Sequence, residues 1–432
     1  MKRVLIVSPR FPPRNAPDHH RVRASLPHYE AFGWKPTVLC VSSATSDGVD
    51  DPLLADSLPP QVEVVRVDAW REAASRRLGF GHLDWRCTWP LYRAGTRLLE
   101  QRRFDLVFFS TTAFLTFTLG PSWKRRFGCK VVYDIQDPWY TDEPVYDRSN
   151  VPGSWWKYRL SRAIARRAER HSMRAADHLL TVSPAYAERL SGRYPWLGPG
   201  DFTLVPFGGA TDDFTFMRER GVRHRVFERG PGERHWVYAG RVGPDMHGVL
   251  NAFFEQLARW RQDEPQAARG LKLHFVGTNY SPEARTYKVV EPLAARHGLA
   301  DVVREQPVRI SYFETLSLYE DSDAVLLFGA DSADYTASKL FNCVQSGRPV
   351  LALFHASSLA ARLAGGMPNA FTATFGASPG EPAFAACVRR GLEWAHRSPQ
   401  VARTAIEAAI SPWSAPELTR IQCAAFDKAL AA

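Results

Sequence analysis

Short apolar runs alternate along the chain with longer stretches in which apolar side chains recur every three or four positions. In the first half the short runs are RVLIVSP, PTVLCVS, VEVVRV, DLVFFST, KVVYDI and HLLTVS; in the second half they are HWVYAG, LKLHFVG, VVREQPV, DAVLLFG and PVLALF. Helical periodicity fills the intervals, for example at residues 248–262, 281–297 and 339–346. Continuous apolar strands separated by helices predict parallel sheets covered on both faces, as in doubly wound α/β proteins.

This alternation runs through both halves of a chain of 432 residues, which is too long for one ordinary core. A Gly-Gly pair and an acidic turn around residues 205–215 suggest a hinge. We therefore expect Rossmann-like domains at 1–206 and 207–410. Residues 411–432 form one further helical pattern without a strand, which we expect to pack back on the first domain. Ligands of such domains bind outside the carboxyl ends of the strands, so the catalytic site is predicted in the cleft between them.

Composition narrows the possible partners. The formal net charge of +10 favours polyanions, namely nucleic acid, an acidic membrane face or phosphorylated small molecules. The six cysteines are scattered without a C-x-x-C pair, so we expect reduced thiols and no zinc site. The first apolar run, VLIV, is short of a signal peptide core, and no later run is long enough to span a bilayer. The sequence thus predicts a cytoplasmic protein.

The stretch WWKYRLSRAIARRAERHSMRAAD, residues 155–177, is the main charge feature. One interpretation is a solvated helix with an ordinary core stripe. The other is a helix that lies on anionic lipid headgroups through residues 155–174, because Trp and Arg suit the membrane interface.

Two cations stand at the predicted ligand edge of the second domain. Arg241 follows the strand WVYAG, where its guanidinium could hold a diphosphate through several donors. Lys339 lies in DYTASKLF, just before a predicted helix whose first backbone N–H groups, at residues 338–340, would face a bound phosphate. Together they predict a cradle for a nucleoside diphosphate.

With these pieces in place, the sequence resembles the retaining GT-B glycosyltransferases, specifically glycosyltransferase family 4. The resemblance rests on the order and spacing of RAADHLLTVSPAYAERL, the AGR turn, LHFVG, SYFETLSLYEDSDAVLLF, KLFNCVQSGRPVLAL and a terminal helix after PWS. It implies two Rossmann-like domains that face each other across a cleft. It also implies a nucleotide-sugar donor on the second domain, a glycan or lipid-linked acceptor on the first, retention at the anomeric carbon, and no metal or other cofactor.

The family signature is two Glu residues separated by seven others. Counting back from the G-R-P-V turn places Asp334 and Asn342 at these two positions. The resemblance then implies that Arg241 and Lys339 hold the diphosphate, that Asn342 contacts the ribose, and that Asp334 contacts the transferred sugar.

In the first domain, VVYDIQDPWYTDEP matches the segment where the family has a His-Asp pair, and here the pair is Gln136-Asp137. Asp137 is expected to orient the acceptor hydroxyl or the transferring sugar; the alternative is an acidic helix cap. In the loop after the first strand, Arg14, His19, His20 and Arg21 could meet donor phosphates or an anionic acceptor. Adjacent histidines need not converge on one metal, and we expect no metal site there.

Three other functions stay open at this point. A nucleotide-sugar epimerase shares the architecture but needs a proton-abstracting carboxylate and His set that the sequence does not reveal. A non-catalytic scaffold would explain the altered signature at Asp334, Asn342, Gln136 and Phe207. A nucleic-acid binder is suggested by charge alone, without a recognised motif, so we expect no nucleic-acid partner.

Overall fold

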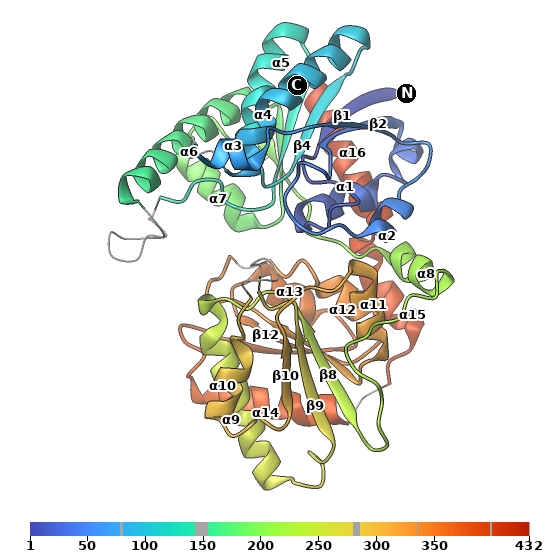
Figure 1. Cartoon of the computed structure of the whole chain (residues 1–432), viewed down its shortest axis with the longest axis vertical. Coiled ribbons are helices and arrows are strands. Elements are labelled where there is room, and N and C mark those ends of the chain that lie inside the picture. Colours follow the sequence, from blue (N-terminus) through green and yellow to red (C-terminus); the bar gives the residue numbers. More distant parts are fainter. Residues whose placement is uncertain (78–80, 143–153, 280–285, 335, 398–399, 432) are drawn as a thin grey trace. The chain divides into compact units, whose positions relative to one another are not determined.

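The computed structural model describes residues 1–77, 81–142, 154–279, 286–334, 336–397 and 400–431. The chain divides into two compact units, Met1–Pro206 with Ala415–Ala432, and Phe207–Ser414. Each unit contains one parallel sheet with helices packed around it (Figure 1). The predicted pair of doubly wound α/β domains is thus confirmed. Part of the predicted helix at 281–297, residues 281–285, lies outside the described residues.

The sheet of the first unit has seven parallel strands in the order β3-β2-β1-β4-β5-β6-β7. Its strands are β1 (Lys2–Val7), β2 (Trp34–Val41), β3 (Glu63–Val67), β4 (Leu106–Ser110), β5 (Lys130–Ile135), β6 (His178–Thr181) and β7 (Phe202–Leu204). The central strands β4 and β5 are almost wholly buried, which explains their continuous apolar sequences. The short edge strand β7 is half-exposed and has no apolar run, so the sequence pattern did not reveal it.

Helices cover this sheet and end with the last helix of the chain. They are α1 (His20–Ser25), α2 (Pro52–Asp56), α3 (Glu72–Arg77), α4 (Leu83–Gln101), α5 (Leu119–Phe127), α6 (Trp155–Ala175), α7 (Pro184–Arg193) and α16 (Ala415–Ala431), with 3-10 turns η1 (Pro17–His19), η2 (Tyr29–Phe32), η3 (Phe114–Thr118) and η4 (Pro199–Asp201). The ring of Phe426 on α16 packs edge-on against Trp34 and lies 5.0 Å from the ring of Phe108. The indole of Trp34 also donates to Asp427 at 3.0 Å. These contacts fix α16 in the core of the first unit.

The sheet of the second unit has six parallel strands in the order β10-β9-β8-β11-β12-β13. Its strands are β8 (Arg234–Ala239), β9 (Leu271–Val276), β10 (Val303–Gln306), β11 (Ala324–Phe328), β12 (Val350–His355) and β13 (Ala370–Phe375). Edge strand β13, with the sequence AFTATF, is only partly buried and escaped prediction for that reason.

Eight helices of the described chain surround this sheet. They are α8 (Thr211–Glu219), α9 (His247–Asp263), α10 (Val290–Arg296), α11 (Tyr312–Asp321), α12 (Leu340–Gln345), α13 (Leu359–Gly365), α14 (Pro382–His396) and α15 (Arg403–Ile410), with 3-10 turns η5 (Pro244–Met246) and η7 (Ser411–Trp413). Trp236, Phe253, Phe275 and Phe328 form the centre of the apolar core. The N–H of Gly209 donates to the carbonyl of Trp413 at 3.0 Å, so the two ends of this unit meet.

Strand order reverses between β1 and β4 in the first unit and between β8 and β11 in the second. The loops that leave these strands at their carboxyl ends diverge at the reversal, and this is where doubly wound folds bind ligands. In the described part of the chain, no helix is both long and apolar enough to cross a bilayer.

Candidate functional site

Three cationic side chains gather at the ligand edge of the second sheet. Arg241 follows β8, Arg309 follows β10, and Lys339 immediately precedes α12. The Lys339 ammonium donates to the carbonyl of Ala239, the last residue of β8, at 2.7 Å. Burial, and then the charges of Arg309 and Arg241, lower the pKa of Lys339 to about 8. The positive charges of Lys339, Arg309 and Arg241 act on one another in a half-buried place, and this repulsion favours the binding of an anion.

Two glycines shape the space around these cations. A Cβ on Gly240 would come within 2.2 Å of the Lys339 ammonium, so only glycine lets this side chain reach the end of β8. Gly277, just after β9, has a φ of +69°, and a Cβ there would lie 3.2 Å from Cγ of Arg309. The glycines in the turns that end β8 and β9 therefore leave the space that the side chains of Lys339 and Arg309 occupy.

The Arg241 guanidinium is held by Asp245 in a two-pronged ion pair, with N–O distances of 3.1 and 2.8 Å. Both side chains are partly exposed, at 38% and 42%, so solvent screens the pair. The paired oxygens of Asp245 occupy positions that two phosphate oxygens could take. Arg309 was not singled out from the sequence, although a cation directly after a strand of the same sheet was a usable signal.

The two remaining predicted donor-site residues, Asp334 and Asn342, flank Lys339 in the sequence. The Asn342 amide donates to the Tyr312 hydroxyl at 3.3 Å, and that hydroxyl donates to buried Asp213 at 2.7 Å. Asp334 is half-buried, and its N–H donates to the Ser332 hydroxyl at 3.2 Å.

The helix expected after Lys339 is only six residues long, and Lys339 is its N-cap. So short a helix has little dipole. The charge at this place therefore comes mainly from the side chain of Lys339, and the contact of the backbone N–H groups at 338–340 with a phosphate stays a prediction.

In the first unit, Gln136 is a structural residue. It is buried, and its amide donates to Asp134 at 2.8 Å, to the Ser110 hydroxyl at 3.0 Å and to the Asp18 carbonyl at 3.2 Å. These bonds join the ends of β4 and β5 to the loop after β1. Asp137, the next residue, is exposed. Of the predicted Gln136-Asp137 pair, only Asp137 is therefore placed to meet a ligand.

The residues expected to bind anions after β1 lie mostly in the interior. The Arg21 guanidinium lies 2.8 Å from Asp134 and donates to the carbonyl of Val205 at 2.6 Å. Arg14 is buried and bonds to the carbonyls of Ser43 and Gly48. His19 is fully buried, and burial together with the charge of Arg23 lowers its pKa to about 4. The loop is held by these groups, so the expectation that Arg14, His19 and Arg21 meet donor phosphates or an anionic acceptor is wrong.

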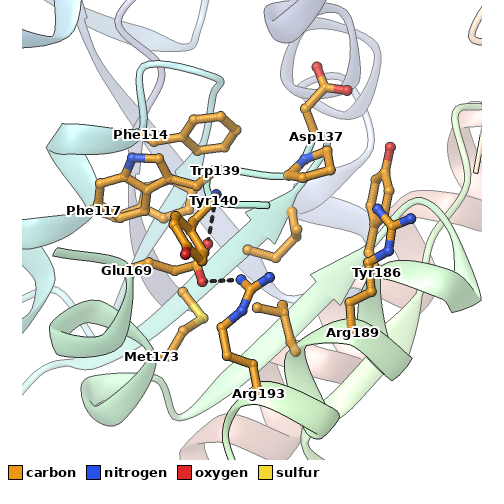
Figure 2. A pocket seen from close by; sticks show the side chains of 13 residues that line it. Phe114, Phe117, Asp137, Trp139, Tyr140, Glu169, Met173, Tyr186, Arg189 and Arg193 are labelled. Carbon is orange, nitrogen blue, oxygen red and sulfur yellow. Dashed lines mark hydrogen bonds and ion pairs between the residues drawn. The ribbon is translucent and has the colours of Figure 1, made fainter. Parts of the chain in front are cut away.

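The first unit also contains a small pocket, partly open to solvent, at the carboxyl end of β5 (Figure 2). Its lining consists of Phe114, Phe117, Ile135, Asp137, Pro138, Trp139, Tyr140, Glu169, Met173, Tyr186, Arg189, Leu190 and Arg193. Figure 2 shows the rings of Phe114, Phe117 and Trp139 together on one side, with Tyr186 and Arg189 on the other, while the Asp137 carboxylate points away. The rings of Phe114 and Trp139 stack at 5.8 Å.

Glu169 holds this pocket together from α6. Its buried carboxylate accepts from Arg193 at 2.5 Å, from the Tyr194 hydroxyl at 2.8 Å and from the N–H of Tyr140 at 3.1 Å. Burial raises the pKa of Glu169, while the bonds from Tyr194 and Arg193 oppose that rise. Glu169 was not predicted from the sequence, although it is the single acidic position in an Arg-rich helix.

Among the described residues there is no cluster of three His, Cys, Asp or Glu side chains that could hold a metal ion.

The fold and the cation cluster define a two-domain α/β protein of the GT-B class. Residues 19–208 match the family model of the glycosyl transferase 4-like domain. Most of the first unit thus matches a glycosyl transferase 4-like domain, which confirms the resemblance to glycosyltransferase family 4. No curated protein sequence matches the chain.

Several solved structures share the whole architecture. Anabaena HepE in complex with UDP-glucose is 14% identical, with a TM-score of 0.61 and 98% of each chain covered. An α,α-trehalose-phosphate synthase from Burkholderia xenovorans is 12% identical, with a TM-score of 0.63 and 100% of each chain covered. A putative UDP-N-acetylglucosamine 2-epimerase from Listeria monocytogenes is 11% identical, with a TM-score of 0.51, covering 97% of this chain and 94% of its own. At these identities the likeness establishes the fold.

Proposed function

We propose that this protein is a retaining glycosyltransferase that moves a sugar from a UDP-sugar to a hydroxyl group of a glycan or lipid-linked acceptor. The observation that carries the proposal is the convergence of Arg241, Arg309 and Lys339 beside the reversal of the second sheet. The choice of UDP is supported by Anabaena HepE, whose structures contain UDP and UDP-glucose.

The donor residues would act mainly through electrostatics. Arg241 and Lys339 hold the diphosphate, and they stabilise the negative charge that grows on it as the glycosidic bond breaks. Diphosphate oxygens replace Asp245 as partners of Arg241. Asn342 contacts the ribose and Asp334 the transferred sugar, while Asp137 orients the acceptor hydroxyl. The reaction requires no metal, because these cations supply the positive charge.

Equilibrium binding of UDP tests the donor site. We expect Arg241→Met and Lys339→Met each to weaken UDP binding at least about tenfold, since each removes a charge-assisted contact. Arg259→Met is the matched control, because Arg259 lies on α9 with its side chain 62% exposed. Unchanged UDP affinity in both site variants would refute the assignment.

Product analysis separates the transferase from its alternatives. Proton NMR of UDP-glucose turnover should show release of a sugar that keeps the α configuration, with no effect of EDTA. Conversion of UDP-N-acetylglucosamine to its 2-epimer without acceptor would indicate an epimerase, the second fold relative. Tight UDP binding without any turnover would indicate a scaffold.

We also propose that the protein works at the cytoplasmic face of a membrane, held by α6. Trp156 and Leu160, one turn apart on this helix, are 71% and 62% exposed. Farther along, the guanidinium groups of Arg170 and Arg174 lie 5.9 and 5.0 Å from the ring of Trp196, which is also exposed. Flotation with phosphatidylglycerol vesicles, but not with phosphatidylcholine vesicles, is expected, and Trp156→Ser with Leu160→Ser should abolish it.

A further inference from the structure

A polar pocket of about 370 Å³, open to solvent, lies in the second unit. It is found where α11 and α12 end, beside the loops that lead into the amino ends of β11 and β12. The donor cations stand at the other edge of the same sheet, where strands end. The lining of the pocket includes Arg223, Ser317, Glu320, Asp321, Ser346 and Arg348.

Both carboxylates of this pocket are paired with basic side chains from outside the lining. The Arg218 guanidinium forms an ion pair with Glu320. The His224 ring bonds to Asp321 at 3.0 Å, and Arg229 bonds to the same carboxylate at 3.2 Å. Although burial opposes the effect, these two bonds lower the pKa of Asp321. The carboxylates are therefore charged but compensated, and they offer little repulsion to an anion.

The two arginines of the lining are not compensated in this way. Within the described ranges, no hydrogen bond or ion pair engages the guanidinium of Arg223 or the two terminal nitrogens of Arg348. Nε of Arg348 donates to the carbonyl of Glu320 at 2.7 Å. This bond holds the Arg348 side chain at the pocket and caps the end of α11, whose carbonyls would otherwise repel an anion.

A hydroxyl group adds a further donor. Ser317 is buried, and its oxygen accepts the N–H of His224 at 3.3 Å, so its own hydrogen is available to a ligand. The chain beside the pocket is also basic: residues 218–229 contain five Arg and two Glu. Forked guanidinium groups in such surroundings hold phosphate oxygens through pairs of charge-assisted bonds.

The composition of the lining narrows the ligand further. It contains no aromatic ring on which a base could stack and no long apolar side chain that could cover a hydrocarbon. Its volume exceeds that of a phosphate ion several times over, and the remaining lining groups are hydroxyl and carboxylate oxygens that suit the hydroxyl groups of a sugar.

We propose that this pocket is a binding site for a small sugar phosphate. The phosphate lies between Arg223 and Arg348, and a sugar hydroxyl accepts from Ser317. Other sugar hydroxyls donate to the outer oxygens of Glu320 and Asp321. This inference goes beyond the proposed donor site: a phosphorylated metabolite binds here without displacing the nucleotide.

Calorimetric titration of the full chain with glucose 6-phosphate, in the presence of excess UDP, tests the site. The Arg241→Met and Lys339→Met double variant provides a second background, because it lacks two of the donor cations that would also attract phosphate. On both backgrounds we expect Arg223→Met to weaken binding at least about tenfold, since it removes a charge-assisted contact. Arg225→Met is the matched control, an exposed Arg of the same segment outside the lining.

Arg348→Met should weaken binding at least as much, because this side chain is held at the pocket. If that variant fails to fold, Arg223→Met still decides the matter, since it breaks no contact in the described ranges and should unfold in urea like wild type. Unchanged affinity for glucose 6-phosphate in Arg223→Met, or an equal loss in Arg225→Met, would overturn the assignment.

Three further titrations decide the ligand class. Glucose should not bind, because it lacks the charge that the two arginines select. Inorganic phosphate and UMP should each bind at least about tenfold more weakly than glucose 6-phosphate, the first because it lacks the hydroxyl contacts and the second because its base finds no ring to stack on. Glucose, phosphate or UMP binding as tightly as glucose 6-phosphate would refute a sugar phosphate site.

Discussion

The Lys339 ammonium lies 2.7 Å from the carbonyl oxygen of Ala239, so the residue that precedes α12 is tied to the end of β8. These two residues are far apart in the sequence, and their contact brings the charge of Lys339 to the loop that carries Arg241. The arrangement makes the proposed donor site sensitive to pH, to backbone shape and to the like charges around it.

UDP binding should weaken as the pH rises through about 8. The pKa of Lys339 is lowered to about 8, so its ammonium is charged below that value and progressively lost above it. Between pH 7 and pH 9.5 we expect a loss of about tenfold in affinity, the worth of one charge-assisted contact. Lys339→Arg keeps its charge over this range and should show no such decline. A decline of equal size in that variant would assign the titration to another group.

Gly240→Ala should impair binding more than folding. The added methyl group would meet the Lys339 ammonium, which is the end of a flexible side chain and can move away. We expect UDP affinity to fall several-fold while the free energy of unfolding changes by less than about 1 kcal/mol. Gly365→Ala is the control, because nothing lies within 4 Å of the position its methyl group would take. Calorimetry and urea unfolding measure the two effects on one sample.

Arg21→Met should destabilise the first unit. The side chains of Arg21 and Asp134 are 5% and 0% exposed, and the substitution leaves a buried carboxylate without its cation. Loss of one partner of a buried pair typically costs about 3–5 kcal/mol. Urea unfolding checks this value against Arg103→Met, whose side chain is 92% exposed. A similar small change in both variants would show that Asp134 is stabilised by its other contacts alone.

The second unit should lose stability on acidification through a buried histidine pair. The His235 and His274 rings are joined by a 3.0 Å N–N hydrogen bond, and burial followed by the nearby His235 lowers the pKa of His274 to about 4. The unfolded chain takes up this proton near pH 6.5 and the folded chain only near pH 4. The stabilising effect is therefore complete above pH 6.5 and is lost as the pH falls.

By pH 5 the expected loss from His274 is about 2 kcal/mol. Urea unfolding at pH 7 and pH 5 measures it. His274→Gln cannot be protonated, so the stability gap between wild type and this variant should narrow by that amount at the lower pH. An unchanged gap would mean that the folded chain protonates His274 as readily as the unfolded one.

The sequence predicted the architecture because apolar strands buried on both faces leave a strong signal. The short strand β7 and the edge strand β13 escaped because partial burial breaks their apolar runs. At the candidate site, Arg241 was recognisable from its place after a strand, whereas Arg309 depended on knowing that β10 lies in the same sheet. The buried role of Gln136 and the pocket around Glu169 depend on contacts between segments far apart in sequence, which no local pattern contains.

The return of α16 to the first unit makes the second unit an insertion within a single longer domain. The backbone hydrogen bond from Gly209 to Trp413 brings the two ends of that insertion together. Residues 207–414 therefore have neighbouring ends and a core of their own, the features of a module that can be moved between chains. In evolutionary terms, a module of this kind, which carries the proposed donor site, can be exchanged for another while the surrounding domain keeps both of its halves.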